Sequence, residues 1–322
     1  MSDASKLKIL ITGGGGMLAH ALAQTFYAFG VDHKLMSRAE LDITKIDDIL
    51  KVLDAEKPTH LINCAAYTKV DQAEKEPGQA VEINGKSVGN LADACKRRNI
   101  KLVHYSTDYV FADGDRTPRK IDDPLRPKGA YGVSKLLGER MIAEINPPGW
   151  ILIRTAWLYG PNGPNFVQTM LNAARAGKPL KVIQDQTGSP TYTFDLASAT
   201  LELIRANASG TFHLTNSGET NWFEFTRAIM DEFGITPTSL TPITSADWQT
   251  IKPDSAARPS YSVLDLSDYT RATGFKMPDW RDGLKRYHAR IDSVAASVSI
   301  PVSSPEASAD SQTSRPASRK RR

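Results

Sequence analysis

The sequence has very little cysteine, and this scarcity excludes one class of fold. Cys64 and Cys95 are the only two among 322 residues, too few for a disulfide-stabilised scaffold and in keeping with a reducing, cytoplasmic location. The six histidines are scattered, and none stands at a metal-ligand spacing from a cysteine or another histidine. We therefore predict no metal site.

Long apolar runs are also missing. No run approaches the roughly 18 residues that cross a bilayer, and residues 9–11 are too short for the apolar part of a signal peptide. Residues 293–322 hold five basic and two acidic residues, which leaves only +1 of the net charge of +4 on the rest of the chain. The sequence therefore predicts neither a membrane nor a nucleic-acid partner.

The first half of the chain alternates short apolar runs with stretches of helical periodicity. This alternation is typical of βαβ units, so we expect an α/β fold with a doubly wound parallel sheet. Prolines break the second half, which predicts a smaller mixed α/β C-terminal lobe. We expect a sheet domain over residues 1–160, a lobe over 161–290 that is partly interleaved with it, and a disordered tail over 291–322. The expected strands are 6–12, 34–36, 59–65, 101–106 and 150–155, and the expected helices are 17–29, 79–98, 132–145, 165–176, 194–206 and 222–233.

A glycine-rich loop follows the first expected strand. The pattern Gly13-x-x-Gly16-x-x-Ala19 ends that strand and opens a helix, which is the context in which such a pattern binds a dinucleotide. The glycines permit a tight turn close to a pyrophosphate, and the helix N-terminus offers free N–H groups. We therefore expect residues 1–160 to be a Rossmann-type NAD(P)-binding domain and residues 161–290 to bind the substrate.

The end of the second strand bears on the choice between NAD and NADP. Ser37 and Arg38 stand there, and a hydroxyl with a guanidinium suits a 2′-phosphate, whereas NAD usually needs a carboxylate on its ribose. Glu40 and Asp42 are close by, so NADPH is favoured and NADH stays possible. Asp42 and Ile43 are placed to flank the adenine.

Tyr131 and Lys135 stand four residues apart, which puts both on one face of a helix. A nearby ammonium favours phenolate, so we expect Lys135 to lower the pKa of Tyr131 from about 10. Such a tyrosine can donate a proton to a carbonyl oxygen as hydride arrives. Thr107 ends an expected strand, at the sheet edge where open α/β sheets bind ligands, and could hydrogen-bond the same oxygen.

These three residues resemble the catalytic triad of the extended short-chain dehydrogenase/reductases. Four runs are similar to the dTDP-4-dehydrorhamnose reductase family, within a resemblance that covers residues 6–288: NCAAYTKVD at 63–71, STDYVF at 106–111, RTAWLYG at 154–160 and DQTGSPT at 185–191. The resemblance implies that NADPH reduces C4 of dTDP-4-dehydro-L-rhamnose to give dTDP-L-rhamnose. It implies that Tyr131 protonates O4, Lys135 holds the nicotinamide ribose, and Thr107 orients the ketone.

The resemblance also implies which residues contact the two ligands. Trp157 would stack on the sugar, with a core tryptophan as the alternative, and Arg258 would face the diphosphate, with a surface salt bridge as the alternative. Asp71 and Glu74 could bind sugar hydroxyls or serve as helix-dipole partners. Asn84 matches an asparagine near the lysine. The implied cofactor contacts are Gly13, Gly16, Met17, Leu18, Ala65, Ala66, Tyr67, Tyr105, Tyr131 and Lys135, and the implied substrate contacts are Thr107, Asp108, Trp157 and Arg258.

Several alternatives stay open. The motifs do not separate sugar epimers, so the chain could reduce another dTDP-4-keto-6-deoxysugar, or it could be a non-catalytic dinucleotide-binding regulatory subunit. An epimerase or dehydratase is also possible on this fold, although only one acidic residue, Asp108, follows Thr107 where a dehydratase would need a pair. Some members of the resembled family dimerise around magnesium held by acidic residues, and Ala21 stands at one of those places, which argues against magnesium. We expect a monomer or homodimer.

Overall fold

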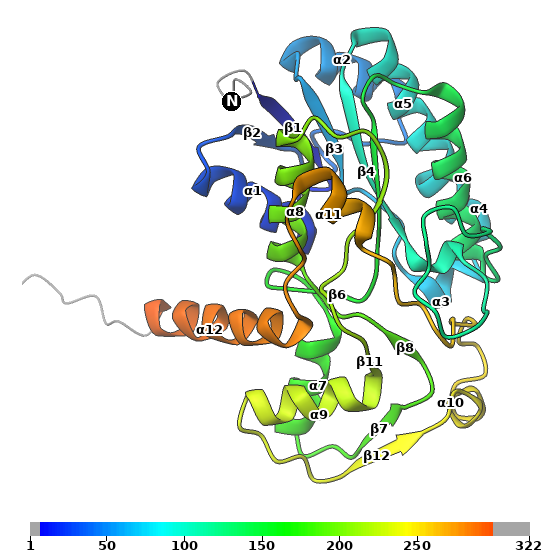
Figure 1. Ribbon diagram of the computed structural model, residues 1–322, viewed down its shortest axis with the longest axis vertical. Coiled ribbons are helices and arrows are strands. Elements are labelled where there is room, and N and C mark those ends of the chain that lie inside the picture. Colours follow the sequence, from blue (N-terminus) through cyan, green and yellow to red (C-terminus); the bar gives the residue numbers. More distant parts are fainter. Residues whose placement is uncertain (1–6, 299–322) are drawn as a thin grey trace, which may run out of the picture.

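Six parallel strands form the central sheet of the computed structural model, which describes residues 7–298. Their order is β10-β5-β4-β3-β1-β2, and helices cover both faces (Figure 1). The predicted α/β fold with a doubly wound parallel sheet is therefore confirmed. The strands are β1 (Lys8–Thr12), β2 (Asp32–Leu35), β3 (His60–Asn63), β4 (Lys101–Thr107), β5 (Ile151–Thr155) and β10 (Gly210–His213).

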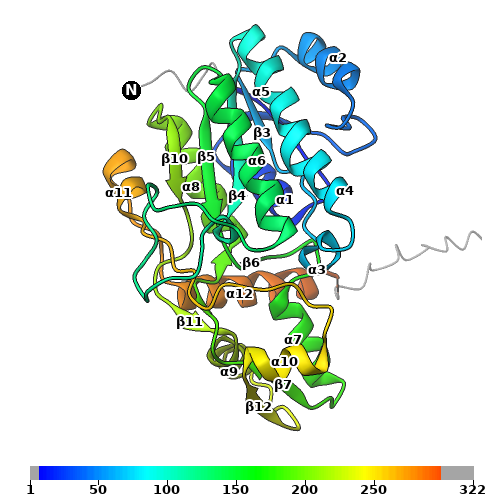
Figure 2. The same cartoon turned by 90° about the vertical axis from the view of Figure 1, so that its right-hand side faces the viewer.

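The sheet separates two cores because side chains alternate along each strand. In β1, Ile9 and Ile11 pack in the cluster that includes Phe26, whereas Leu10 packs in the cluster that includes Leu53 and Leu91. Figures 1 and 2 show the helices of the two clusters on opposite faces of the sheet. One face carries α1 (Met17–Ala28), α8 (Thr193–Arg205) and α11 (Ser267–Thr273), and the other carries α2 (Ile46–Glu56), α5 (Ser87–Arg98) and α6 (Ala130–Ile145).

The helix expected over residues 79–98 is present but is not uniform. It begins as α4 (Pro77–Val81), with proline in its first turn, and passes through a π-helical segment (Glu82–Lys86) before α5. The wider turn of a π-helix often marks a functional site. Asn84 lies in this segment with its side chain buried, and the short helix α3 (Val70–Ala73) precedes it.

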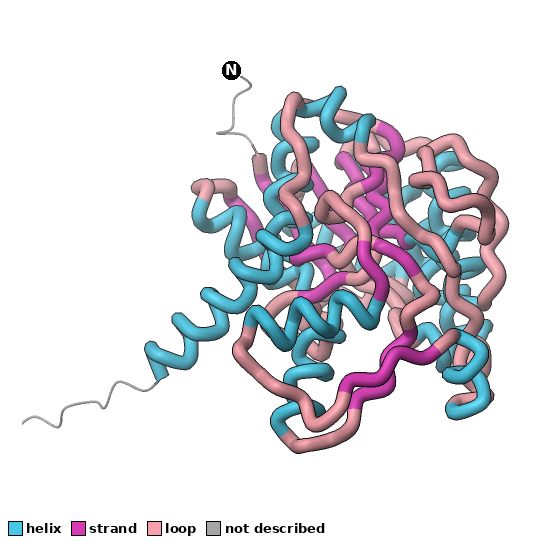
Figure 3. Tube along the Cα trace, turned by 60° about the horizontal axis from the view of Figure 1, so that its bottom comes forward, coloured by secondary structure: helices cyan, strands magenta, loops and turns pink. Residues whose placement is uncertain are grey.

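A smaller lobe lies below the carboxyl edge of the sheet (Figure 2). Its core is aromatic, with Tyr159, Phe225, Trp280 and Tyr287 almost fully buried. Its strands form two-stranded sheets separate from the central sheet, and one such pair is seen at the bottom of Figure 3. The pairs are β7 (Leu180–Ile183) with β12 (Leu240–Ile243), β6 (Leu158–Tyr159) with β9 (Thr191–Tyr192), and β8 (Thr187–Gly188) with β11 (Thr220–Asn221). The helices are α7 (Phe166–Arg175), α9 (Trp222–Glu232), α10 (Ser245–Ile251) and α12 (Trp280–Val298).

Part of the expected disordered tail is helical. α12 continues to Val298, because its aromatic face, with Trp280 and Tyr287, is anchored in the lobe core; the rest of the expected tail, residues 299–322, lies outside the described residues. The division of the chain near residue 160 stays a prediction, although α8 and β10 return to the sheet from the second half. No helix within residues 7–298 is long and apolar enough to span a membrane.

Candidate active site

The glycine loop between β1 and α1 has the geometry that its sequence predicts. Gly13 has a φ of +72°, and a Cβ there would stand 2.7 Å from the backbone nitrogen of Ala65, so only glycine fits. The Gly16 N–H donates to the Gly13 carbonyl at 2.9 Å. Gly16 is the N-cap residue of α1, so no side chain caps this end of the helix. The first turn of α1 therefore keeps backbone N–H groups for an anion. Ala19 is fully buried against the sheet.

A cavity of about 410 Å³ opens beside this loop, at the carboxyl ends of β1, β3, β4 and β5. Open parallel sheets bind ligands at this edge. Most of the residues that the sequence singles out meet there. Those that line it are Gly16, Met17, Leu18, Ala65, Ala66, Tyr105, Thr107, Asp108, Tyr131, Lys135 and Trp157.

The predicted adenosine-side residues lie outside this cavity, at the end of β2. The Gly14 N–H donates to the Met36 carbonyl at 2.8 Å, so the following residues stand next to the glycine loop. The Arg38 side chain is 78% exposed and pairs with Asp42 at 3.4 Å, while Ser37 donates to Glu40. Ile43 is buried.

Tyr67 also lies apart from the cavity lining. Its N–H donates to the Asn84 side chain and its carbonyl accepts from it, both at 2.9 Å, and its phenol donates to Glu76. The Asn84 amide also donates to Ser134 at 3.0 Å, which joins the π-helical segment to the helix that carries Tyr131 and Lys135. Asn84 therefore bridges the backbone of Tyr67 and helix α6.

Lys135 is almost fully buried, and its ammonium donates to the Tyr105 carbonyl oxygen at 2.6 Å. Burial lowers its pKa to about 8, and the Glu139 carboxylate and the Cys64 thiol oppose that shift. The expectation that Lys135 lowers the pKa of Tyr131 is wrong. Burial raises the pKa of Tyr131, the Asp108 carboxylate raises it further, and a hydrogen bond with Thr107 opposes both. The tyrosine is consequently a neutral phenol near neutral pH.

Thr107 is hydrogen-bonded to a buried carboxyl group. The Thr107 hydroxyl donates to Asp108 Oδ1 at 2.9 Å and accepts the Tyr109 N–H at 3.2 Å. Burial raises the pKa of Asp108 to about 6, against hydrogen bonds from Ser262 and Thr107. Thr107 and Asp108 are therefore hydrogen-bonded at the end of β4, in the cavity that Tyr131 also lines.

A buried ion pair that the sequence analysis missed holds the helix and the strands that carry these residues. Arg154 in β5 contacts Glu139 in α6 at 2.8 Å, with both side chains no more than 5% exposed. The Ser106 hydroxyl donates to the same carboxylate, so the pair ties α6 to the ends of β4 and β5. Glu139 stands one helical turn after Lys135, and that spacing was the available signal.

Trp157 lines the cavity beside the glycine loop, the candidate catalytic cavity, and has a positive φ of 49°. Its indole stacks on Trp222 with ring centroids 3.4 Å apart and planes 8° apart. Trp222 lines a second cavity of about 320 Å³ in the lobe, together with Trp248, Lys181 and Arg258. Arg258 thus lies in the second cavity rather than the catalytic one, and its guanidinium donates to Asp71 at 2.9 Å. Sequence analysis missed Trp222 and Trp248, which belong to no motif.

Within the described part of the chain, no group of three or more His, Cys, Asp or Glu side chains could hold a metal ion. Cys64 and Cys95 are free thiols, and burial raises the pKa of both. The side chains that line the cavity include a phenol, an ammonium, a hydroxyl and a carboxyl group, from Tyr131, Lys135, Thr107 and Asp108.

Comparisons with known proteins find a family match and relatives that are named as reductases of dTDP-sugars. Residues 7–293 match the family described as "RmlD substrate binding domain". The chain is 37% identical over 306 residues to a dTDP-4-dehydrorhamnose reductase of Mycolicibacterium smegmatis, covering 94% of this chain and 90% of the relative. It is 38% identical over 280 residues to the spore coat polysaccharide biosynthesis protein SpsK of Bacillus subtilis, covering 87% and 96%. A dTDP-4-keto-6-deoxy-D-glucose reductase of Streptomyces niveus is 35% identical over 279 residues, covering 85% and 94%.

Solved structures agree with these relatives. A dTDP-4-dehydrorhamnose reductase of Bacillus anthracis, in complex with NADP, superposes with a TM-score of 0.83. The two sequences are 36% identical, and the match covers 88% of this chain and 99% of the other.

Proposed function

The chain belongs to the RmlD substrate-binding family, and from this membership we propose that it reduces the C4 ketone of dTDP-4-dehydro-L-rhamnose with NADPH to give dTDP-L-rhamnose. One observation carries the proposal: Thr107, Tyr131 and Lys135 line the same cavity as the glycine loop at the start of α1. That arrangement brings a proton donor and a dinucleotide-binding loop to one site.

The residues present fit a nicotinamide dinucleotide. The Gly13 turn leaves no room for a side chain, and the uncapped start of α1 suits a pyrophosphate. Met17, Leu18, Ala65, Ala66 and Tyr105 would line the bound cofactor, with Ser37, Arg38, Asp42 and Ile43 at its adenosine end. NADPH, when bound, supplies the hydride.

The protein's own residues handle the proton and the orientation of the ketone. Tyr131 is held as a neutral phenol by burial and by Asp108, so it carries the proton that O4 needs. The Thr107 hydroxyl is oriented by Asp108 and by the Tyr109 N–H, and it would lie beside the same oxygen. Lys135, fixed by the Tyr105 carbonyl, would bind the nicotinamide ribose.

The substrate would extend from the catalytic cavity towards the lobe. Asp108 and Trp157, which line the catalytic cavity, would contact the sugar. Arg258 lines the second cavity, where its guanidinium would suit the diphosphate. The Streptomyces niveus relative, named as a dTDP-4-keto-6-deoxy-D-glucose reductase, favours a second candidate of the same class, a reductase of another dTDP-4-keto-6-deoxysugar.

A spectrophotometric assay separates the candidates. Purified protein is mixed with dTDP-4-dehydro-L-rhamnose or with dTDP-4-dehydro-6-deoxy-D-glucose, and NADPH or NADH oxidation is followed. The proposal predicts the highest kcat/KM with the first sugar and NADPH. Faster turnover of the second sugar would favour the second candidate, and NADPH binding without any turnover would favour a regulatory subunit.

The location, the oligomeric state and the partners of the protein are proposed as well. We propose a cytoplasmic monomer or homodimer with no nucleic-acid partner, in which residues 161–290 provide most of the substrate lobe. Two free cysteines support a reducing compartment.

A further inference from the structure

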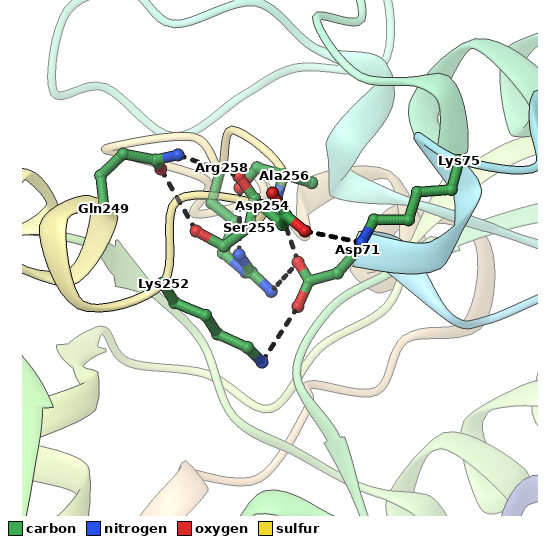
Figure 4. A network of polar contacts seen from close by, with 8 residues as sticks. All are labelled: Asp71, Lys75, Gln249, Lys252, Asp254, Ser255, Ala256 and Arg258. Atoms are coloured by element: carbon green, nitrogen blue, oxygen red, sulfur yellow. Dashed lines mark hydrogen bonds and ion pairs between the residues drawn. The ribbon is translucent and has the colours of Figure 1, made fainter.

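One carboxylate of the sheet domain holds three groups of a short segment of the lobe. Asp71 in α3 accepts from Arg258 Nη2 at 2.9 Å and from the Ala256 N–H at 3.1 Å, and Lys252 Nζ lies 3.7 Å from its other oxygen (Figure 4). All three donors belong to residues 252–258, which follow α10. Asp71 therefore fixes both the backbone and two cations of this segment.

The position of this contact relates it to both cavities. Asp71 directly follows Val70, which lines the catalytic cavity together with Thr68. Arg258 lines the second cavity beside Trp222 and Trp248. It also borders a small pocket together with Tyr109, a residue that lines the catalytic cavity. The Asp71–Arg258 pair thus lies where a ligand that filled both cavities would cross from one to the other.

The local charges are unequal. Asp71 faces two cations, Lys252 and Arg258, whereas Asp254 of the same segment pairs with Lys75 at 2.7 Å (Figure 4). Burial opposes ionisation of Asp71, but the Ala256 amide and the Arg258 guanidinium outweigh it and hold its pKa below the ordinary range. The cluster of one carboxylate and two cations keeps a net positive charge that suits an anion.

Arg258 is held in one orientation by two contacts. Nη1 donates to its own segment at the Ala256 carbonyl, 3.0 Å away, while Nη2 donates to Asp71. The side chain is only 24% exposed. A guanidinium fixed in advance loses less conformational freedom when it binds a phosphate than a mobile one does.

We propose that Asp71 is a positioning residue for the nucleotide diphosphate: it holds Arg258 and Lys252 at the junction of the two cavities so that both cations face the diphosphate of the nucleotide sugar. The inference rests on the proposed function and deepens it. A carboxylate this close to a diphosphate repels it, so its contribution must come from the order that it gives to the two cations. Asp71 itself does not touch the reacting atoms.

Binding of dTDP and of thymidine, measured by calorimetry, tests the proposal without any turnover. Asp71→Asn should weaken dTDP binding about tenfold, because Arg258 loses its charged anchor, and should leave thymidine and NADPH binding unchanged. Asp254→Asn is the matched control: it removes an ion pair between the same two segments without freeing Arg258 or Lys252, and dTDP should bind it as it binds the parent. In turnover, Asp71→Asn should raise KM about tenfold and change kcat less than about twofold.

A double-mutant cycle identifies the residue through which Asp71 acts. In an Arg258→Ala background, Asp71→Asn should have less than about a threefold further effect on dTDP binding. Arg258→Lys, which keeps the charge but loses the fork, should also weaken dTDP binding and serves if Asp71→Asn does not fold. Unchanged or tighter dTDP binding by Asp71→Asn would overturn the inference. The carboxylate would then only link the lobe to the sheet domain, or would compete with the diphosphate for Arg258 and Lys252. If the parent protein binds no dTDP at all, the proposed function itself fails.

Discussion

The indole of Trp157 lies flat against that of Trp222, with ring centroids 3.4 Å apart. Trp157 lines the catalytic cavity and Trp222 lines the second cavity, in the lobe. The stacked pair therefore lies between the two cavities. Trp157 also packs closely on Gly188, where a Cβ would stand 2.6 Å from its ring. The orientation of Trp157, a proposed sugar contact, therefore depends on α9 and on strand β8 at Gly188.

Trp222→Ala should loosen Trp157 and raise KM for the nucleotide sugar. An aromatic pair contributes about 0.5–1.5 kcal/mol beyond its buried area, which corresponds to roughly a 2- to 12-fold change. Steady-state kinetics with saturating NADPH measures the effect, and Trp222→Phe, which keeps an aromatic ring, should lose less. An unchanged KM in Trp222→Ala would show that the stack does not orient the sugar contact.

The reaction should slow above about pH 8. Burial lowers the pKa of Lys135 to about 8, so its ammonium form is present below that pH and is lost above it. If the ammonium is needed, kcat/KM should fall about tenfold per pH unit on the alkaline side. Lys135→Arg, whose guanidinium does not titrate in this range, should show no such limb, whatever its absolute activity. An alkaline limb shared by both proteins would assign it to another group.

The lowered pKa of Lys135 also makes the folding stability of the protein depend on pH. Between pH 8 and the ordinary lysine value of 10.5, the unfolded chain binds the Lys135 proton and the folded chain does not. The contribution of Lys135 to folding stability therefore rises with pH across this window. Urea unfolding of the parent and of Lys135→Met, compared across it, should show the difference.

Arg38→Ala should shift the preference from NADPH towards NADH. The Arg38 side chain is 78% exposed and stands directly after the segment bonded to the glycine loop, so it is available to a 2′-phosphate. We expect the ratio of kcat/KM values for the two cofactors to fall about tenfold. Arg97→Ala, which removes an exposed arginine from a similar pair with Asp93, is the control. A ratio that stays the same would remove Arg38 as the phosphate contact.

Glu139→Gln should destabilise the fold, because it leaves the buried Arg154 without its ionic partner. Breaking one side of a buried pair costs about 3–5 kcal/mol in the free energy of unfolding. Glu224→Gln removes an exposed pair with Arg227 and should cost less than about 1 kcal/mol. Equal losses in urea unfolding for the two variants would mean that the buried pair does not hold α6 to the sheet.

Local conformational demands explain what the sequence could predict. Gly13 has a positive φ and approaches Ala65 closely, and the presence of glycine at this position indicates both features in the sequence. The spacing of Tyr131 and Lys135 is likewise a property of one helix. The strands expected near residues 6–12, 59–65, 101–106 and 150–155 form because apolar side chains there cover both faces of the sheet.

Tertiary contacts explain what sequence analysis did not find. β10 joins the sheet after a long excursion through the lobe, and periodicity does not say which strands pair. The pKa of Tyr131 follows from burial and from Asp108 rather than from the lysine on its own helix, which instead donates to Tyr105. Arg258 and Asp71 meet only because residues 252–258 cross to α3.

Transfer of label from deuterated NADPH tests the central claim most directly. The protein is given NADPH deuterated at the transferring carbon together with dTDP-4-dehydro-L-rhamnose, and the sugar product is examined by NMR. The account predicts dTDP-L-rhamnose with deuterium at C4, and at least about a 100-fold slower reaction in Tyr131→Phe, which lacks only the proton donor, with NADPH binding retained. Unlabelled product, or equal rates in Tyr131→Phe and the parent, would contradict it.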